Sequence, residues 1–508
     1  MKKLFQIVLL TLFVTVLFSS CRKQKSSMTG WNYNDTKQGG FEVTDYQGQA
    51  TGPNLVLVQG GTFTMGNVEQ DVAYDYHSIP RRVTVSSFYI DETEVANVHY
   101  REYLYWLGRT FKADFPEIYR RAFPDSMVWR EELAFNDPYV QYYFRHPSYD
   151  FYPVVGVNWL QANEFCKWRS NRVNEILLAD KKYMELNVNA VNGDNFDTEA
   201  YLLGQYETGI LKGPKDYSPD AVDAKTGRRV KMEDGLMLPD YRLPTEAEWE
   251  FASLGLIGNH IEEEEMMTDR RIYPWNTTSM RYPNTKQKWQ SGEMLANFKR
   301  GRGDYAGIPG KLNDNAIVTA PIYSYLPNDN GLYNMAGNVN EWVADVYRDY
   351  TYLDMEDLNP YRGNNFQTRI LDEEGNVAEK SDTTGRIRYR SVADEELVDR
   401  RNYKRADLRN HVDGDSLSEV SYEYGQSTLV NNNARVYKGG SWADEAYWLA
   451  PGSRRYLEED QASATIGFRC AQIRLGGDVS NDIKGGNHFK KGDTQKKTND
   501  RARKKSQI

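Results

Sequence analysis

The residues of this 508-residue chain best suited to covalent chemistry are its three cysteines, at positions 21, 166 and 470. A thiol can be acylated, bind a metal or form a disulfide, and the redox state of the compartment decides whether a disulfide persists. Cys166 lies in the segment NEFCKWRSN, and Cys470 lies in GFRCA. An oxidising compartment would permit these two to pair, but their positions along the chain leave open whether they are close in space.

Cys21 follows a segment that is typical of a secretory signal. The basic head MKK precedes an apolar stretch at residues 4–18, which is followed by two serines. This stretch is shorter than the roughly 20 apolar residues that a membrane span needs. Residues 1–20 resemble a bacterial lipoprotein signal peptide, although Phe18 stands where Leu is commonest, and Cys21 is then the acylated first residue. The alternative is an ordinary signal peptide with an incidental cysteine.

The residues after Cys21 indicate where such a lipoprotein would reside. They read RKQK and contain no acidic cluster of the kind that sends some lipoproteins to the cell surface. We therefore expect a protein that is held by its acyl chains on the periplasmic face of the outer membrane.

Glu246 and Glu248 are two neighbouring carboxylates that could act as general acid and base. They lie in YRLPTEAEWEFASLG, residues 241–255, where a helix start explains them better. Thr245 can cap the first turn while Glu248 bonds back to the cap. We therefore predict a helix here and no catalytic role. The six histidines are scattered, and the chain has neither a phosphate-binding Gly-rich loop nor a metalloprotease motif.

Hydrophobic periodicity predicts the elements that would position these residues. Residues 54–67, NLVLVQGGTFTMGN, alternate around Gly-Gly and predict a strand, a turn and a strand. Residues 81–107 predict another strand followed by a helix, and residues 157–173 predict an amphipathic helix near Cys166. Its residues expected to face the core are Leu160, Phe165 and Trp168.

Composition favours a globular protein with an acidic surface. Apolar residues make up 40% and charged residues 27% of the chain, and the formal net charge is −9. This charge disfavours nonspecific nucleic-acid binding, so we expect no nucleic-acid partner. Residues 484–508, however, hold nine Lys or Arg and two Asp. This basic tail is expected to be disordered or to dock on an acidic partner.

Eight spaced motifs occur in a fixed order: GGTFTMGN, FYIDETEVAN, YPVVGVNW, YRLPTEAEWEFA, YPWN, GLYNMAGNVNEW, RVYKGGSW and GFRCA. Over about residues 54–475 they resemble the formylglycine-generating enzyme family. The resemblance implies an α+β fold that is related to C-type lectins and has little regular secondary structure. Enzymes of this family oxidise a substrate cysteine to formylglycine in sulfatases, using copper held by two cysteines.

The resemblance also indicates that the copper ligands are absent. In the enzymes they lie just after the GGS turn, five residues apart, and the matching positions here are Asp444 and Leu449. Cu(I) prefers soft thiolates, whereas a carboxylate is a hard ligand and Leu offers none. We therefore expect no copper and no enzyme activity. Asp444 has an alternative role as a surface carboxylate that pairs with Arg454 or Arg455.

Other family sites match residues that retain the required chemistry. Cys166 and Cys470 match a structural disulfide of the family. Two structural calcium sites of the enzymes match oxygen donors, which calcium requires. The first set is Asn297, the Phe298 carbonyl, Asp314 and the Ala316 carbonyl; the second is Asn334, the Gly337 carbonyl, the Val339 carbonyl and Glu341. Asn334 and Glu341 could instead make turn hydrogen bonds without a metal.

A closer resemblance is to the GldJ-type lipoproteins of gliding motility and type IX secretion. It is carried by the lipoprotein signal, TGWNYND…GGF, YFRHPSYDFYPVVGVNW and KGGSWADEAYWLAPGSRRY. We expect a lipidated N-terminus and tether at residues 21–52, one elaborated domain at 53–475 and a tail at 476–508. Insertions at about 109–150, 174–235 and 350–433 fit this type better than the related GldK/PorK type.

The resemblance implies a noncatalytic outer-membrane lipoprotein that supports a periplasmic complex. GldK/PorK forms periplasmic rings with GldN/PorN, so these proteins, related components and outer-membrane lipid are the expected partners. Two alternatives stay open. One is a carbohydrate- or peptide-binding module, from the lectin-like fold alone, and the other is a residual sulfatase-modifying enzyme.

Overall fold

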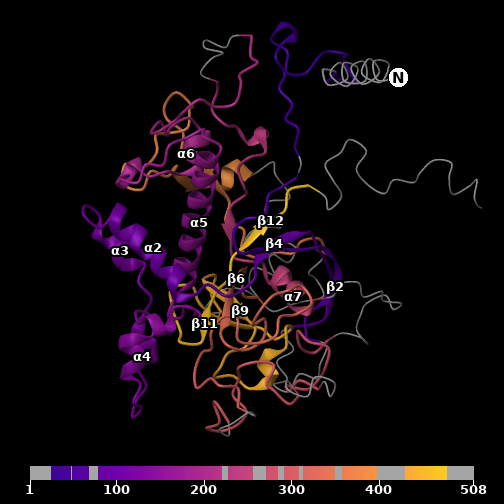
Figure 1. Ribbon diagram of the computed structural model, residues 1–508, viewed down its shortest axis with the longest axis vertical. Helices are drawn as coiled ribbons and strands as arrows, with labels where there is room; N and C mark the ends of the chain where they lie inside the picture. Colours follow the sequence, from indigo (N-terminus) through magenta and orange to yellow (C-terminus); the bar gives the residue numbers. More distant parts are fainter. Residues whose placement is uncertain are drawn as a thin grey trace, which may run out of the picture. The chain divides into compact units, whose positions relative to one another are not determined.

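The computed structural model describes most of the chain (Figure 1). The described residues are 24–46, 48–67, 78–219, 227–255, 271–283, 291–307, 313–348, 357–397 and 430–476. The predicted signal peptide, Cys21 and the basic residues 484–508 lie outside them. Among the described residues, no helix is both long enough and apolar enough to cross a membrane.

The chain divides into two compact units. Unit 1 comprises Met1–Gln47, Glu175–Asn187 and Glu207–Met237, and unit 2 comprises Gly48–Asn174, Val188–Tyr206 and Leu238–Ile508. In unit 1 the carboxylate of Glu42 pairs with Arg228 at 2.6 Å, and Arg228 also pairs with Asp234 at 2.6 Å. Residues 24–46, which the sequence predicted to be a tether, are therefore folded together with part of a predicted insertion.

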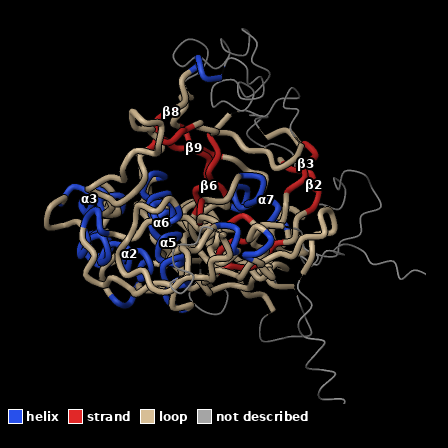
Figure 2. Tube along the Cα trace, turned by 90° about the horizontal axis from the view of Figure 1, so that it is seen from above, coloured by secondary structure: helices blue, strands red, loops and turns tan. Residues whose placement is uncertain are grey.

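Short helices and strands are joined by long loops in the described residues (Figure 2). The α-helices are α2 (Asn97–Thr110), α3 (Pro116–Arg121), α4 (Asp137–Tyr142), α5 (Trp159–Asp180), α6 (Thr198–Leu202) and α7 (Glu246–Leu254). The 3-10 helices are η1 (Thr36–Gln38), η2 (Ser126–Trp129), η3 (Pro147–Tyr149), η4 (Asn192–Asp194), η5 (Met232–Asp234), η6 (Asp394–Leu397) and η7 (Ala446–Leu449). This mixture of helices and separate sheets agrees with the predicted α+β class.

In the described parts of the chain, the strands form two four-stranded and two two-stranded sheets. They are β1 (Leu55–Val58), β2 (Gly61–Met65), β3 (Arg81–Val85), β4 (Phe88–Asp91), β5 (Tyr241–Arg242), β6 (Asn340–Val346), β7 (Gln367–Arg369), β8 (Tyr389–Ser391), β9 (Ala434–Lys438), β10 (Arg455–Glu458), β11 (Ile466–Gly467) and β12 (Ala471–Ile473). The strand orders of the four-stranded sheets are β1-β4-β12-β5 and β10-β9-β6-β11. The two-stranded sheets pair β2 with β3 and β7 with β8. The predicted strands at 54–67 are therefore present as β1 and β2, but they belong to different sheets.

Alternating side chains of β4 and β6 contribute to two hydrophobic clusters in the interior of unit 2. Tyr89 and Trp342 belong to the cluster that includes α2 and α5. Phe88, Ile90 and Val343 belong to the cluster that includes α7, β2 and β3. Because successive side chains of a strand point to opposite faces, each sheet contributes to both clusters.

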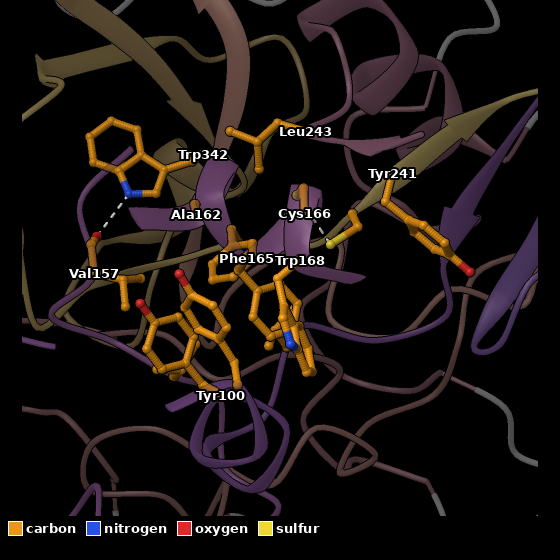
Figure 3. Packing of buried hydrophobic residues seen from close by; sticks show 14 of the residues in the cluster. Tyr100, Val157, Ala162, Phe165, Cys166, Trp168, Tyr241, Leu243 and Trp342 are labelled. Carbon is orange, nitrogen blue, oxygen red and sulfur yellow. Dashed lines mark hydrogen bonds between the residues drawn. The ribbon is translucent and has the colours of Figure 1, made fainter. Parts of the chain in front are cut away.

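The α5 helix supplies aromatic residues to the first cluster (Figure 3). Phe165 stacks on Tyr100 at 5.7 Å between ring centroids, and Trp168 is buried beside Phe165. Burial of each such side chain contributes about 1.5–3 kcal/mol. The prediction that Leu160 also faces the core is wrong, because this side chain is 45% exposed. Five residues along an α-helix correspond to a net rotation of about 140° around the helix axis. Leu160 therefore points away from the face that carries Phe165.

The predicted start of α7 is confirmed. Thr245 Oγ1 accepts a hydrogen bond from the Glu248 amide at 3.2 Å, and Glu248 Oε2 accepts one from the Thr245 amide at 2.9 Å. Glu248 also pairs with Arg242 at 2.6 Å. The side chain of Glu248 is therefore fully occupied by capping and by one ion pair.

Candidate functional site

The GGSW turn, residues 439–442, leads from β9 to the two positions expected to replace the copper ligands. Gly439 and Gly440 have φ of 102° and 70°, which glycine adopts without steric cost. A Cβ added to Gly440 would lie only 2.7 Å from Leu449 Cδ1. The glycines therefore allow the backbone of the turn to pack directly on Leu449.

Asp444 is held in place by a charged and polar network. Its carboxylate accepts hydrogen bonds from Arg455 Nη1 and Nη2 at 2.6 and 2.7 Å, from Ser441 Oγ at 2.6 Å and from Asn340 Nδ2 at 3.1 Å. Burial raises the pKa of Asp444, but the hydrogen bonds and charge of Arg455 outweigh it and hold the pKa below its ordinary value. The alternative pairing with Arg455 is thus present, although the side chain of Asp444 is mostly buried.

Leu449 ends the 3-10 helix η7 and is fully buried. It belongs to a small apolar cluster that includes Met294, Ala296, Phe298 and Ala336. This side chain has no lone pair to offer a metal. Position 444 therefore forms an ion pair, and position 449 makes apolar contacts. Within the described part of the chain, no group of three or more His, Cys, Asp or Glu is arranged to hold a metal ion.

The structure brings together the two cysteines that the resemblance paired. Cys166 of α5 and Cys470, which immediately precedes β12, are buried with their Sγ atoms 3.4 Å apart (Figure 3). Both are free thiols in the structure, and burial raises the pKa of Cys470 well above its ordinary value. Their proximity is compatible with a disulfide in an oxidising compartment, and the bond itself stays a prediction.

The first predicted calcium set contains buried oxygens that the described protein leaves unsatisfied. Asn297 Nδ2 donates to the Val318 carbonyl at 2.7 Å, but Asn297 Oδ1 has no hydrogen-bond partner. Asp314 Oδ2 is likewise buried without a donor, and burial raises the pKa of Asp314 to about 6. Buried polar atoms normally have partners. Unsatisfied buried oxygens are the donors that a hard cation prefers, so the chemistry of these residues fits calcium.

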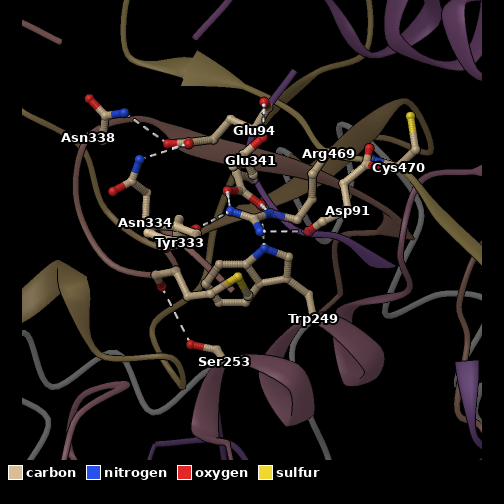
Figure 4. Close-up of polar contacts among 12 residues, drawn as sticks. Asp91, Glu94, Trp249, Ser253, Tyr333, Asn334, Asn338, Glu341, Arg469 and Cys470 are labelled. Atoms are coloured by element: carbon tan, nitrogen blue, oxygen red, sulfur yellow. Dashed lines mark hydrogen bonds and ion pairs between the residues drawn. The ribbon is translucent and has the colours of Figure 1, made fainter. Parts of the chain in front are cut away.

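The second predicted calcium set fits less well (Figure 4). Asn334 Oδ1 is buried without a partner. The carboxylate of Glu341, however, accepts from Arg469 Nε and Nη2, both at 2.6 Å, and from Trp249 Nε1 at 2.7 Å. Glu341 is therefore already neutralised by a buried guanidinium, whereas a calcium ligand would direct its charge to the ion.

Glu94, which follows β4, is a buried acid that the sequence did not single out. Its two carboxylate oxygens accept hydrogen bonds from Asn338 Nδ2 and Asn334 Nδ2, each at 2.9 Å (Figure 4). Burial raises the pKa of Glu94 to about 8. The segment DETE contains three acids, of which Asp91 and Glu94 are buried, and nothing local distinguishes these two from Glu92.

A second group of buried charges involves the first turn of α7. Glu246 pairs with Arg454 at 2.6 Å and with Lys438 at 3.2 Å, and Lys438 also pairs with Glu250 at 2.9 Å. Although burial raises the pKa of Glu246, the charges of Arg454 and Lys438 outweigh it and lower the pKa to about 2. The helix start therefore explains Glu248 but not Glu246, whose side chain forms this ion-pair cluster.

The fold and the GGSW turn define the class of protein. Residues 40–474 match the FGE-sulfatase family, described as the sulfatase-modifying factor enzyme 1-like domain. The chain belongs to this family.

Individual relatives include catalytic and inactive proteins. The formylglycine-generating enzyme of Mus musculus is 25% identical over 306 residues, which are 60% of this chain and 61% of that protein. The enzyme of Streptomyces coelicolor is 31% identical over 130 residues, 26% of this chain and 34% of that protein. This chain thus spans less than two thirds of either enzyme. The inactive C-alpha-formylglycine-generating enzyme 2 of Mus musculus is 27% identical over 302 residues, 59% of this chain and 71% of that protein.

Among solved structures, PvdO from Pseudomonas aeruginosa has a TM-score of 0.40 and 16% identity, covering 82% of this chain and 94% of that chain. A score at this level supports no inference about this protein.

Proposed function

We propose that this protein is a noncatalytic member of the sulfatase-modifying factor family. The observation that carries the proposal is the Asp444–Arg455 ion pair beside the fully buried Leu449. Copper oxidase chemistry needs two soft thiolates. The two positions that the resemblance assigns to them hold a carboxylate that is committed to Arg455 and an alkyl side chain. Relatives named as inactive are compatible with this proposal.

The role we propose is structural, in the type IX secretion and gliding-motility machinery. Its support is the GldJ-type motif series and the lipoprotein signal that ends at Cys21. Acyl chains on Cys21 would hold the domain at the periplasmic face of the outer membrane. GldK/PorK, GldN/PorN and related components are the proposed partners, with no role for nucleic acid. Calcium held by the Asn297 and Asp314 set would stabilise loops and would not take part in a reaction.

Deletion of the gene tests this role directly. We expect loss of type IX cargo from the culture medium, and loss of gliding if the cell glides. The native gene should restore export, whereas Cys21→Ser should not, because it removes the acylation site. Normal export in the deletion strain would overturn the proposed role. Saturable binding to one glycan, with unchanged export, would favour the carbohydrate-binding alternative.

The absence of catalysis needs a separate test on purified protein. The protein is incubated with copper, oxygen and a CxPxR-type peptide, and formylglycine is measured by mass spectrometry. We expect no conversion, while a formylglycine-generating enzyme converts the same peptide in parallel. Turnover by this protein would refute the noncatalytic proposal, whatever the outcome of the secretion assay.

A further inference from the structure

A well-formed pocket lies in unit 2 beside α2, α3 and α5. Its volume is about 430 Å³, within the range of about 300–1,000 Å³ that is usual for small-molecule sites. Apolar and aromatic side chains form much of the wall: Tyr103, Trp106, Leu107, Phe111, Leu160 and Trp168. The pocket involves neither position 444 nor the predicted calcium residues, so it is separate from the site described above.

All three predicted insertions contribute to this pocket. Phe111 and Arg121 come from the insertion at about 109–150, Asn195 from the one at about 174–235, and Arg386 from the one at about 350–433. The pocket is therefore built in part by segments that the sequence indicates as additions to the family domain, and its other lining residues come from α2, α5 and Asn158. Its ligand would accordingly be particular to this kind of chain.

The charged residues at the pocket favour an anion. Among the described residues that line it, Glu164 is the only acid, and it is neutralised by Arg386 at 2.6 Å and by Lys167 at 3.0 Å. Although burial raises the pKa of Glu164, these cations lower it overall, so the group is ionised and paired. Arg121 is exposed, and among the described residues its guanidinium has no ion-pair partner. An unpaired cation therefore lies beside an apolar hollow.

Two further observations indicate that the pocket is incomplete without a ligand. Leu160 is 45% exposed although it lines an apolar wall. The indole nitrogen of Trp168, another wall residue, is buried and has no hydrogen-bond acceptor in the described protein. A ligand with an apolar body and an oxygen acceptor would cover the exposed leucine and could accept from the indole.

We propose that this pocket binds a small amphipathic carboxylate. The apolar body of the ligand would lie among the aromatic side chains, and its carboxylate would pair with Arg121. A charge-assisted bond from a guanidinium to a carboxylate is stronger than a neutral hydrogen bond. A neutral molecule with the same body should bind more weakly, and a cationic one should be excluded. This inference does not depend on the proposed role in secretion.

Titration of the full chain with decanoate in detergent-free buffer tests the proposal. Isothermal titration calorimetry should show saturable binding with one site per chain, weaker binding of decanol and none of decylamine. Arg121→Gln should weaken decanoate binding about tenfold or more, which corresponds to about 1.4 kcal/mol, and should leave decanol binding unchanged. The matched control is Arg120→Gln, which changes the neighbouring exposed arginine of α3 that pairs with Glu117.

A second variant pair tests the mouth of the pocket without disturbing the core. Leu160→Glu places a negative charge beside the bound carboxylate and should abolish decanoate binding, whereas Leu160→Gln should reduce it only modestly. Both changes are tolerable for folding because Leu160 is half-exposed. Equal affinity for decanoate and decylamine, or equal affinity of native protein and Arg121→Gln, would overturn the proposal. Binding of decanoate that never saturates would also overturn it.

Discussion

The carboxylate of Asp444 and the guanidinium of Arg455 form a two-point ion pair with N–O distances of 2.6 and 2.7 Å. Arg455 also donates to Asn340 Oδ1 at 2.8 Å, and Asp444 accepts from Asn340 Nδ2. The pair thus ties the loop after the GGSW turn to strands β10 and β6. A position that the family's enzymes use for a metal ligand serves here, on the proposed alignment, as a structural contact.

Asp444→Ala tests that contact. It leaves the largely buried guanidinium of Arg455 without its charged partner, so we expect the free energy of unfolding to fall by about 2–3 kcal/mol. Urea denaturation measures the loss. Asp137→Ala is the control, because its pair with Arg130 is exposed and should be worth less than about 1 kcal/mol. Equal effects of the two changes would contradict a structural role for Asp444.

The proximity of Cys166 and Cys470 predicts a redox-dependent stability. If they are bonded in the mature protein, reductant should lower the free energy of unfolding by about 2–5 kcal/mol. The measurement is the melting temperature with and without reductant. The double variant Cys166→Ala/Cys470→Ala should be insensitive to reductant. A native protein that melts at the same temperature in both buffers would exclude the disulfide.

Glu246 predicts an acid-sensitive contribution to stability. Its folded pKa of about 2 lies below the ordinary value of 4.5. The stability from this carboxylate is therefore fully present above about pH 4.5 and is lost as the pH falls through 2. Because one pKa unit corresponds to about 1.4 kcal/mol, this contribution is on the order of a few kcal/mol.

Glu246→Gln should accordingly destabilise the protein at pH 7 by about 3–5 kcal/mol, because Lys438 and Arg454 lose a buried counter-charge. The difference from the native protein should shrink as the pH falls from 4.5 to 2 in chemical denaturation. Glu248→Gln is the neighbouring control: glutamine retains the capping hydrogen bond, and loss of the partly exposed ion pair with Arg242 should cost no more than about 1 kcal/mol. A difference between native and Glu246→Gln that is constant with pH would refute this account.

The unsatisfied oxygens of Asn297 and Asp314 predict stabilisation by calcium. At a free concentration 100 times the dissociation constant, calcium should stabilise the fold by about 2.7 kcal/mol per site. Differential scanning fluorimetry with calcium or with chelator measures the shift. Asp314→Asn should remove most of it, and the exposed Asp137→Asn should not. An identical calcium shift in native protein and Asp314→Asn would exclude this set as a ligand.

Local sequence patterns predicted the elements that depend on near neighbours. The capping box of Thr245 and Glu248 involves residues three apart, so the start of α7 could be predicted and is confirmed. The period of apolar residues also located β1, β2 and the helix that contains Phe165 and Trp168. The same helical geometry places Leu160 about 140° around the helix from Phe165, off the core face.

Ordered motifs and local periodicity are sufficient to predict the family and the α+β class, and the residue types at positions 444 and 449 follow from the same motifs. Which charged side chains meet depends on the tertiary structure. Glu246 pairs with Arg454 at a separation of 208 residues and with Lys438 at 192, and the pocket at Arg121 is lined by four separate segments of the chain. Burial and charge pairing between distant segments depend on how the whole chain packs. No local pattern encodes them.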